Sequence, residues 1–196
     1  MKNITLSFFL SFITFFAFAT KSHVDNVRVN AKSSTIKWTG SKSYESHEGT
    51  VNIKKGILNI NHGTLVGGQI SIDMNSIHTT DMETRLNKKL DNHLKNEDFF
   101  NVEKFPEATL KIRKSVKGEG KMYKIVADLT IKDITRPISF MAEVDINGSN
   151  FVASAELNID RTKWDIKYKS GSIFKDLGDK AILDEIKFEI FLVSDK

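Results

Sequence analysis

The stretch Ile125-Val-Ala-Asp-Leu-Thr-Ile-Lys132 alternates apolar and polar side chains. Successive side chains of a β-strand point to opposite faces, so the alternation predicts a strand with one buried face. The same pattern follows Pro137, from Ile138 to Ile146, and returns near the end of the chain from Ile186 to Ile190. These three stretches indicate a β-rich fold, because they predict half-buried strands.

Shorter alternating segments occur along the rest of the chain, at 35–38, 50–53, 57–60, 65–74, 109–112 and 151–159. Turn-forming residues separate them, as in Asn61-His62-Gly63 and Asn147-Gly148. Many half-buried strands at short spacing favour an all-β protein built from antiparallel hairpins, either a sandwich or a closed barrel.

One segment has a different period. From Thr80 to Leu94, the apolar residues recur every four positions, at Met82, Leu86, Leu90 and Leu94. This spacing predicts an amphipathic helix over about 80–94. Thr80, with Glu83 three residues later, matches a capping box, which predicts that the helix starts there. A single helix among strands would be a lid or a side brace.

The first residues have the three parts of a secretory signal. Met1-Lys2-Asn3 is basic, the run 4–18 is mostly apolar, and Ala17-Phe18-Ala19 matches a cleavage site. The alternative, a membrane anchor, needs ~20 apolar residues. We therefore expect a cleaved signal at 1–19, a periplasmic or secreted protein, and no integral membrane segment after cleavage.

Composition limits the classes of function. The remaining chain suits one domain, expected at 26–194. Without cysteine, it can form neither disulfides nor cysteine-ligated metal sites. The 29 basic residues are interspersed with 25 acidic ones, which is typical of a solvated surface, and we expect no nucleic-acid partner.

Motifs for catalysis are incomplete. His47-Glu48 begins like a zinc-protease motif, but Val51 stands where the second histidine belongs. The sequence contains no G-x-S-x-G, and the other histidines lack the close spacing of metal ligands from one element. We therefore predict no catalytic residues, no metal and no cofactor.

Several motifs resemble the YceI family when taken in order, from about residue 26 to residue 193. They are Trp38-Thr-Gly40, His47-Glu-Gly-Thr50, Gly68-Gln-Ile-Ser-Ile-Asp-Met-Asn-Ser-Ile77, the segment 90–100 with Phe105-Pro106, Leu129-Thr-Ile-Lys-Asp-Ile-Thr-Arg-Pro137, Asp160-Arg-Thr-Lys-Trp-Asp-Ile166 and Gly171-Ser172. The resemblance implies an antiparallel, lipocalin-like β-barrel outside the cytoplasm. It also implies a polyisoprenoid or isoprenoid-quinone ligand inside the barrel, without catalytic residues or metal.

The predicted inward faces supply the candidate ligand-binding residues. A barrel of about eight strands can hold one elongated ligand if side chains do not fill it. For each candidate, ordinary core packing is the alternative. Phe99 and Phe100 would line the mouth of the barrel or anchor the helix. The candidates are Ile36, Trp38, Ile70, Ile72, Phe99, Phe100, Leu110, Ile112, Ala127, Leu129, Ile131, Ile138, Phe140, Ala142, Leu157, Ile159, Ile186 and Phe188.

Three functions stay open at this level. The first is a lipid-binding carrier or store in the cell envelope, and the second is an enzyme that acts on an isoprenoid in the same cavity. The third is a structural, stress-response or adhesion module whose barrel is filled. The size of any internal cavity separates the first from the third. The sequence leaves the oligomeric state open, a homodimer included.

Overall fold

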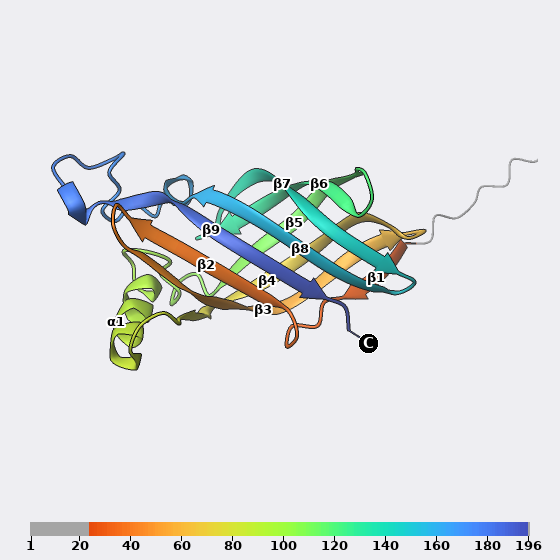
Figure 1. Cartoon of the computed structure of the whole chain (residues 1–196), viewed down its shortest axis with the longest axis horizontal. Coiled ribbons are helices and arrows are strands. Elements are labelled where there is room, and N and C mark those ends of the chain that lie inside the picture. Colours follow the sequence, from red (N-terminus) through yellow and green to blue (C-terminus); the bar gives the residue numbers. More distant parts are fainter. Residues whose placement is uncertain (1–23, 196) are drawn as a thin grey trace, which may run out of the picture.

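The computed structural model describes residues 24–195, so the expected signal at 1–19 lies outside the described residues. The described chain forms nine strands, one α-helix and two short 3-10 helices (Figure 1). The strands are β1 (Val24–Arg28), β2 (Thr35–Lys42), β3 (Ser46–Asn61), β4 (Thr64–Thr79), β5 (Glu107–Lys117), β6 (Met122–Ile131), β7 (Ile134–Asn147), β8 (Asn150–Asp160) and β9 (Ile182–Val193). The helices are α1 (Thr84–Lys95), η1 (Arg161–Trp164) and η2 (Gly178–Lys180).

The strands form one antiparallel sheet that closes on itself. Its order is β1-β3-β2-β9-β8-β7-β6-β5-β4, and pairing of β3 with β4 completes the ring. β1 and β2 share one edge of β3: β2 pairs with residues 46–51 and β1 with residues 57–61. The wall therefore has eight strand positions, and the predicted antiparallel barrel is confirmed.

The burial pattern of β6 and β7 follows the predicted alternation. Along β6, every second residue from Tyr123 to Ile131 is buried. On β7, Ala142 is buried whereas its neighbour Met141 is 48% exposed. The period of the side chains therefore places the apolar face of these strands inward, as the sequence predicts.

The helix begins later than predicted. Thr79 still belongs to β4, and the backbone N–H of Thr80 donates to the carbonyl oxygen of Glu48 in β3. Glu83 is the N-cap residue, and its side chain makes no capping hydrogen bond, so the predicted capping box does not form. Asn87 closes this turn instead, because its side chain bonds both the N–H and the carbonyl of Met82. The hydrogen bond to β3 holds Thr80 in the sheet, so Thr80 cannot cap the helix as the sequence predicts.

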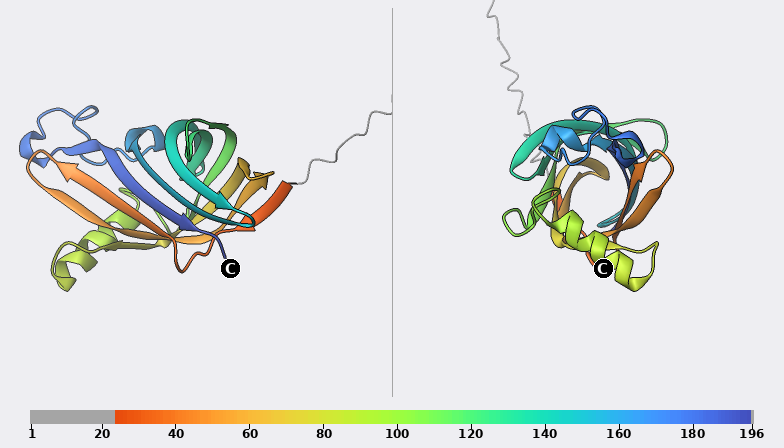
Figure 2. Two further views of the ribbon diagram at one scale, coloured as in Figure 1. Left: turned by 45° about the vertical axis from the view of Figure 1, so that its right-hand side comes forward. Right: turned by 90° about the vertical axis from the view of Figure 1, so that its left-hand side faces the viewer.

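The barrel is divided along its axis into a packed half and a hollow half. The packed half lies at the end with β1 and the β3–β4, β5–β6 and β7–β8 turns (Figure 1). Its inward side chains contact one another, and several are at most 2% exposed: Leu58, Ile60, Leu65, Tyr123, Ile125, Ala127 and Phe151. The opposite end carries the β2–β3 turn, α1 and the 166–181 loop (Figure 2).

Candidate functional site

A cavity of about 610 Å³ occupies the hollow half. This volume lies within the range of pockets that bury one small-molecule ligand. Side chains from seven strands and from α1 line it, and most of them are apolar. The lining reaches Ser41 and Lys42 at the end of β2, Lys89 on α1 and Lys169 in the 166–181 loop. The cavity therefore opens at this end of the barrel, and we refer to the opening as the mouth.

The structure brings together twelve of the eighteen predicted ligand-binding residues around this cavity. Strand alternation identified most of them, and Phe99 and Phe100 follow α1. That these residues bind a ligand remains a prediction. The twelve are Ile36, Trp38, Ile72, Phe99, Phe100, Leu110, Leu129, Ile131, Leu157, Ile159, Ile186 and Phe188.

The other six predicted residues do not line this cavity. Alternation shows which way a side chain points but not how far along the barrel axis it lies. Ala127, for example, is fully buried among the side chains of the packed half. The six are Ile70, Ile112, Ala127, Ile138, Phe140 and Ala142.

Two of these six lie at a gap in the barrel wall. β7 pairs with β8 only between Ala142 and Asn147, so the first half of β7 diverges from β8. Ile138 and Phe140 border a smaller, more open cavity of about 430 Å³ at this gap. Leu157 lines both cavities.

Sequence reasoning missed several lining residues. Val51, Met74 and Ile77 lie in long strands, and Leu90 and Leu94 lie on the predicted helix stripe. The periodic patterns contain four of these residues, whereas Ile77 lies beyond the alternating segment 65–74. Tyr168 lies in an irregular loop, where side-chain period carries no information.

An aromatic cluster joins the segment after α1 to the 166–181 loop. The ring of Phe99 lies 5.0 Å from His93 and 5.5 Å from Tyr168, measured between centroids. His93 and Tyr168 meet edge to face at 4.7 Å. Phe99 is 5% exposed and lines the cavity, so it both anchors the helix segment and shapes the mouth.

Arg161 connects three parts of the chain near the cavity. Its guanidinium donates to the carbonyl oxygens of Ile166 at 2.7 Å, Ile182 at 3.1 Å and Leu183 at 3.1 Å. It also lies 3.4 Å from the carboxylate of Asp184. Burial lowers the pKa of Arg161, and the negative charge of Asp184 acts in the opposite direction. The side chain is 1% exposed, so these contacts replace its hydration.

A buried carboxylate attaches α1 to β4. Asp91 accepts a hydrogen bond from the backbone N–H of Thr79 at 2.6 Å, and its other oxygen lies 2.9 Å from Nδ1 of His78. Burial alone would raise the pKa of Asp91. The hydrogen bonds from Thr79 and His78 outweigh burial, so the pKa lies below its ordinary value of 3.8.

This contact predicts a pH dependence. A carboxyl with a depressed pKa stabilises the fold above its ordinary pKa of 3.8, and this contribution is lost as pH falls through the lower native value. Unfolding by denaturant from about pH 5 to pH 3 should therefore show falling stability, and Asp91→Asn should show a shallower fall. An identical pH slope in wild type and Asp91→Asn would contradict this account.

An antiparallel barrel with an apolar cavity open at one end defines a class of ligand-binding β-barrels. A family model described as the YceI-like domain matches residues 27–193. The chain therefore belongs to the YceI family, as the ordered motifs indicate.

Relatives extend the comparison. A UPF0312 protein of Photorhabdus laumondii is 34% identical over 91 residues, which are 46% of each chain. The chain thus spans about half the length of such curated relatives. The fold resembles that of BcnA from Burkholderia cenocepacia, with a TM-score of 0.66, 20% identity and coverage of 85% and 99%. A polyisoprenoid binding domain from Saccharophagus degradans gives a TM-score of 0.62, 14% identity and coverage of 89% and 99%.

Two further findings concern other classes of site. Within residues 24–195, histidine and acidic side chains form no group of three or more that could hold a metal ion. In the same part of the chain, no helix has the length and hydropathy needed to cross a membrane.

Proposed function

We propose that the protein binds one long apolar lipid, a polyisoprenoid or an isoprenoid quinone, in this cavity. It acts as a carrier or store in the cell envelope and catalyses no reaction. The observation that carries the proposal is the cavity of about 610 Å³ with its apolar lining. The signal-like residues 1–19 support the envelope location.

The family supports the same class of ligand. One structural neighbour, from Saccharophagus degradans, is a polyisoprenoid binding domain. A shared barrel alone does not determine a shared ligand, so the cavity of this chain has to supply the physical argument.

Burial of the lipid supplies ample driving force. Each methylene that leaves water contributes about 0.8 kcal/mol. A chain of tens of carbons would gain far more than any measured affinity, and the entropy lost on ordering the chain offsets the excess. Such a cavity selects the length and girth of the chain.

The lining favours binding over the two alternatives. A filled structural barrel would extend the close packing of the Ala127 region to both ends, whereas the cavity occupies the hollow half. An enzyme would direct an unsatisfied polar group at the ligand. Arg161, the buried charged residue of the lining, already donates to three carbonyl oxygens.

Two alanines test the proposal as a matched pair. Ala108 on β5 lines the cavity, whereas Ala127 on β6 lies in the packed half, and they are 3% and 0% exposed. Ala108→Phe should fill part of the cavity and reduce the co-purified lipid about tenfold, which corresponds to about 1.4 kcal/mol of binding free energy. Extraction from the native host and mass spectrometry measure this lipid per mole of folded protein.

Ala127→Phe is the control. A larger side chain in a packed core costs about 1–3 kcal/mol, so this variant should unfold more easily and still carry lipid when folded. Ala108→Phe should lose lipid without a comparable loss of stability. The proposal fails if the wild type carries no extractable lipid, or if both variants retain it fully.

A further inference from the structure

Exposed apolar side chains gather beside the mouth of the cavity. Tyr44 is 89% exposed, Leu183 49%, Phe174 48% and Ile173 43%. We call these four residues the mouth patch. Single exposed apolar residues are ordinary on soluble proteins, but a group of them beside a binding cavity points to an interaction surface.

Backbone pairing brings the mouth patch together. Lys42, two residues before Tyr44, pairs with Ile182, the residue before Leu183. Ser170 forms a bridge with the same Ile182. The carbonyl of Ser170 accepts hydrogen bonds from the N–H groups of Ile173 and Phe174. The β2–β3 turn and the 170–174 turn therefore flank the start of β9.

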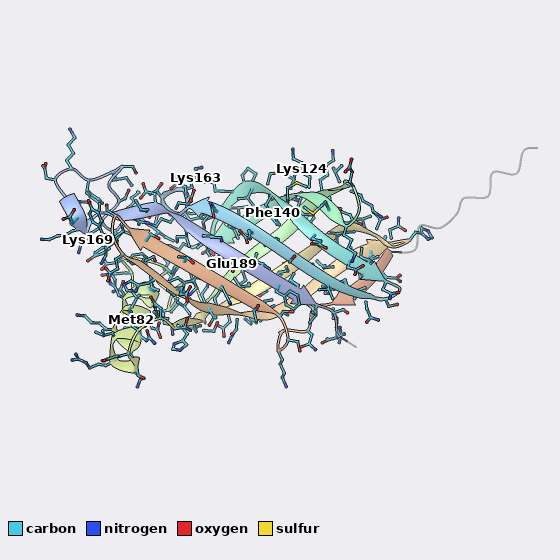
Figure 3. All side chains as sticks on the ribbon, in the orientation of Figure 1. Met82, Lys124, Phe140, Lys163, Lys169 and Glu189 are labelled. Carbon is cyan, nitrogen blue, oxygen red and sulfur yellow. The ribbon has the colours of Figure 1, made fainter. Side chains whose placement is uncertain are left out.

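The mouth patch is continuous with the cavity lining. Leu183 belongs to both, and the cavity also reaches Lys42 and Lys169, which neighbour the two turns. Figure 3 shows Lys169 at this open end and Lys124 at the opposite end of the barrel. A molecule that covers the patch would also cover the cavity entrance.

Basic residues outnumber acidic ones around the patch. The cavity lining contains four basic residues, Lys42, Lys89, Arg161 and Lys169, and one acidic residue, Glu45, which pairs with Lys42 at 2.8 Å. Within residues 24–195, neither Lys89 nor Lys169 has an ion-pair partner. The 166–181 loop carries four lysines and two aspartates, and Lys175 directly follows Phe174.

We propose that this end of the barrel docks on an anionic membrane surface. The mouth patch enters the interfacial layer, where aromatic and aliphatic side chains leave water, and the lysines contact anionic headgroups. The cavity mouth then faces the bilayer, and an apolar chain can pass between the two without crossing water. This inference rests on the proposed lipid-binding function and adds the partner surface.

Charge distinguishes a membrane from a second copy of the chain. A two-fold contact through the mouth would set the same lysines of both copies against each other. Like charges brought together in this way disfavour the contact, whereas an anionic surface neutralises them. The exposed apolar side chains and the basic residues around them thus both fit an anionic membrane surface better than a second copy of the chain.

Co-sedimentation with vesicles tests the proposal on the full exported protein. Vesicles of phosphatidylcholine mixed with phosphatidylglycerol should bind it, and added salt should weaken this binding. Pure phosphatidylcholine vesicles should bind it weakly. Phe174→Ser should reduce binding to the anionic vesicles about tenfold, and Lys175→Glu about fivefold or more.

Matched controls lie away from the mouth. Phe191 on β9 is 42% exposed and pairs with Thr35 and Ser154, so Phe191→Ser removes a similar apolar side chain elsewhere. Lys124→Glu makes the same charge change at the far end of the barrel. Both controls should bind vesicles like the wild type.

The outcomes separate docking from lipid binding. Docking is supported if Phe174→Ser and Lys175→Glu bind vesicles more weakly and the two controls do not. This result supports docking even if the wild type carries no lipid. In that case only the proposed lipid binding in the cavity fails. Equal binding by all four variants, or no binding of wild type to anionic vesicles, overturns docking. A wild-type dimer that Phe174→Ser dissociates, without vesicle binding, identifies the mouth patch as a contact between copies and likewise overturns it.

Discussion

Arg161→Ala is expected to lower the free energy of unfolding by about 3 kcal/mol or more. The guanidinium is buried and donates to the carbonyl oxygens of Ile166, Ile182 and Leu183. Its removal leaves these three acceptors without their donor, at about 1–3 kcal/mol for each buried group that stays unsatisfied. It also leaves the carboxylate of Asp184 without the positive charge that lies 3.4 Å away. The attachment of the 166–181 loop to β9 should weaken first.

Denaturant unfolding measures this effect, and Lys163→Ala is its control. The Lys163 side chain is 63% exposed and lies 4.0 Å from Asp160, so its loss should change stability by less than about 0.5 kcal/mol. Arg161→Lys keeps the charge but lacks the planar fork that reaches several carbonyls, and it should be intermediate. A loss below about 1 kcal/mol in Arg161→Ala would show that the carbonyls find other donors.

Gly49→Ala should be the second severe change. A Cβ at Gly49 would lie 2.1 Å from the carbonyl oxygen of His78 and 2.5 Å from the indole ring of Trp38. The indole Nε1 donates to the carbonyl oxygen of Thr50 at 3.2 Å, which holds the ring against this backbone. The methyl group must displace the ring or separate β3 from β4, and overpacking of this kind costs about 1–3 kcal/mol.

Gly40→Ala is the matched control, because a Cβ at Gly40 meets no atom within 4 Å. This substitution should leave the melting temperature unchanged or raise it slightly, since alanine restricts the unfolded chain. Trp38 lines the cavity, so Gly49→Ala should also change the emission of its indole. Equal melting temperatures for the two variants would contradict the close approach at Gly49.

The sequence carries most of the information on the fold and part of that on the site. Strands β6 and β7 follow from side-chain period, because one face of each packs against the interior. The start of α1 does not, because the hydrogen bond from Thr80 to Glu48 comes from a residue distant in sequence. Such a tertiary contact determines where the helix starts, even where local residues match a capping pattern.

The residues that line the cavity are likewise only partly predictable from the sequence. Leu129 and Ala127 are two residues apart on the same face of β6, yet Leu129 lines the cavity and Ala127 is packed solid. The two residues differ in their position along the barrel axis, which side-chain period does not give. The motif around Arg161 carries part of the family resemblance, but the three carbonyls that accept from its guanidinium come from residues that only the folded chain brings together.

The packed half and the hollow half of the barrel differ in how easily the same sheet can deform. β3 and β4 are sixteen residues each and run through both halves, so each has one end held by close-packed neighbours and one end beside empty space. Local opening is easiest where few apolar contacts must be broken. The walls around the cavity can therefore widen to admit a bulky chain while the far end keeps the strand register fixed. The packed half thus keeps the barrel closed while the half around the cavity changes its width.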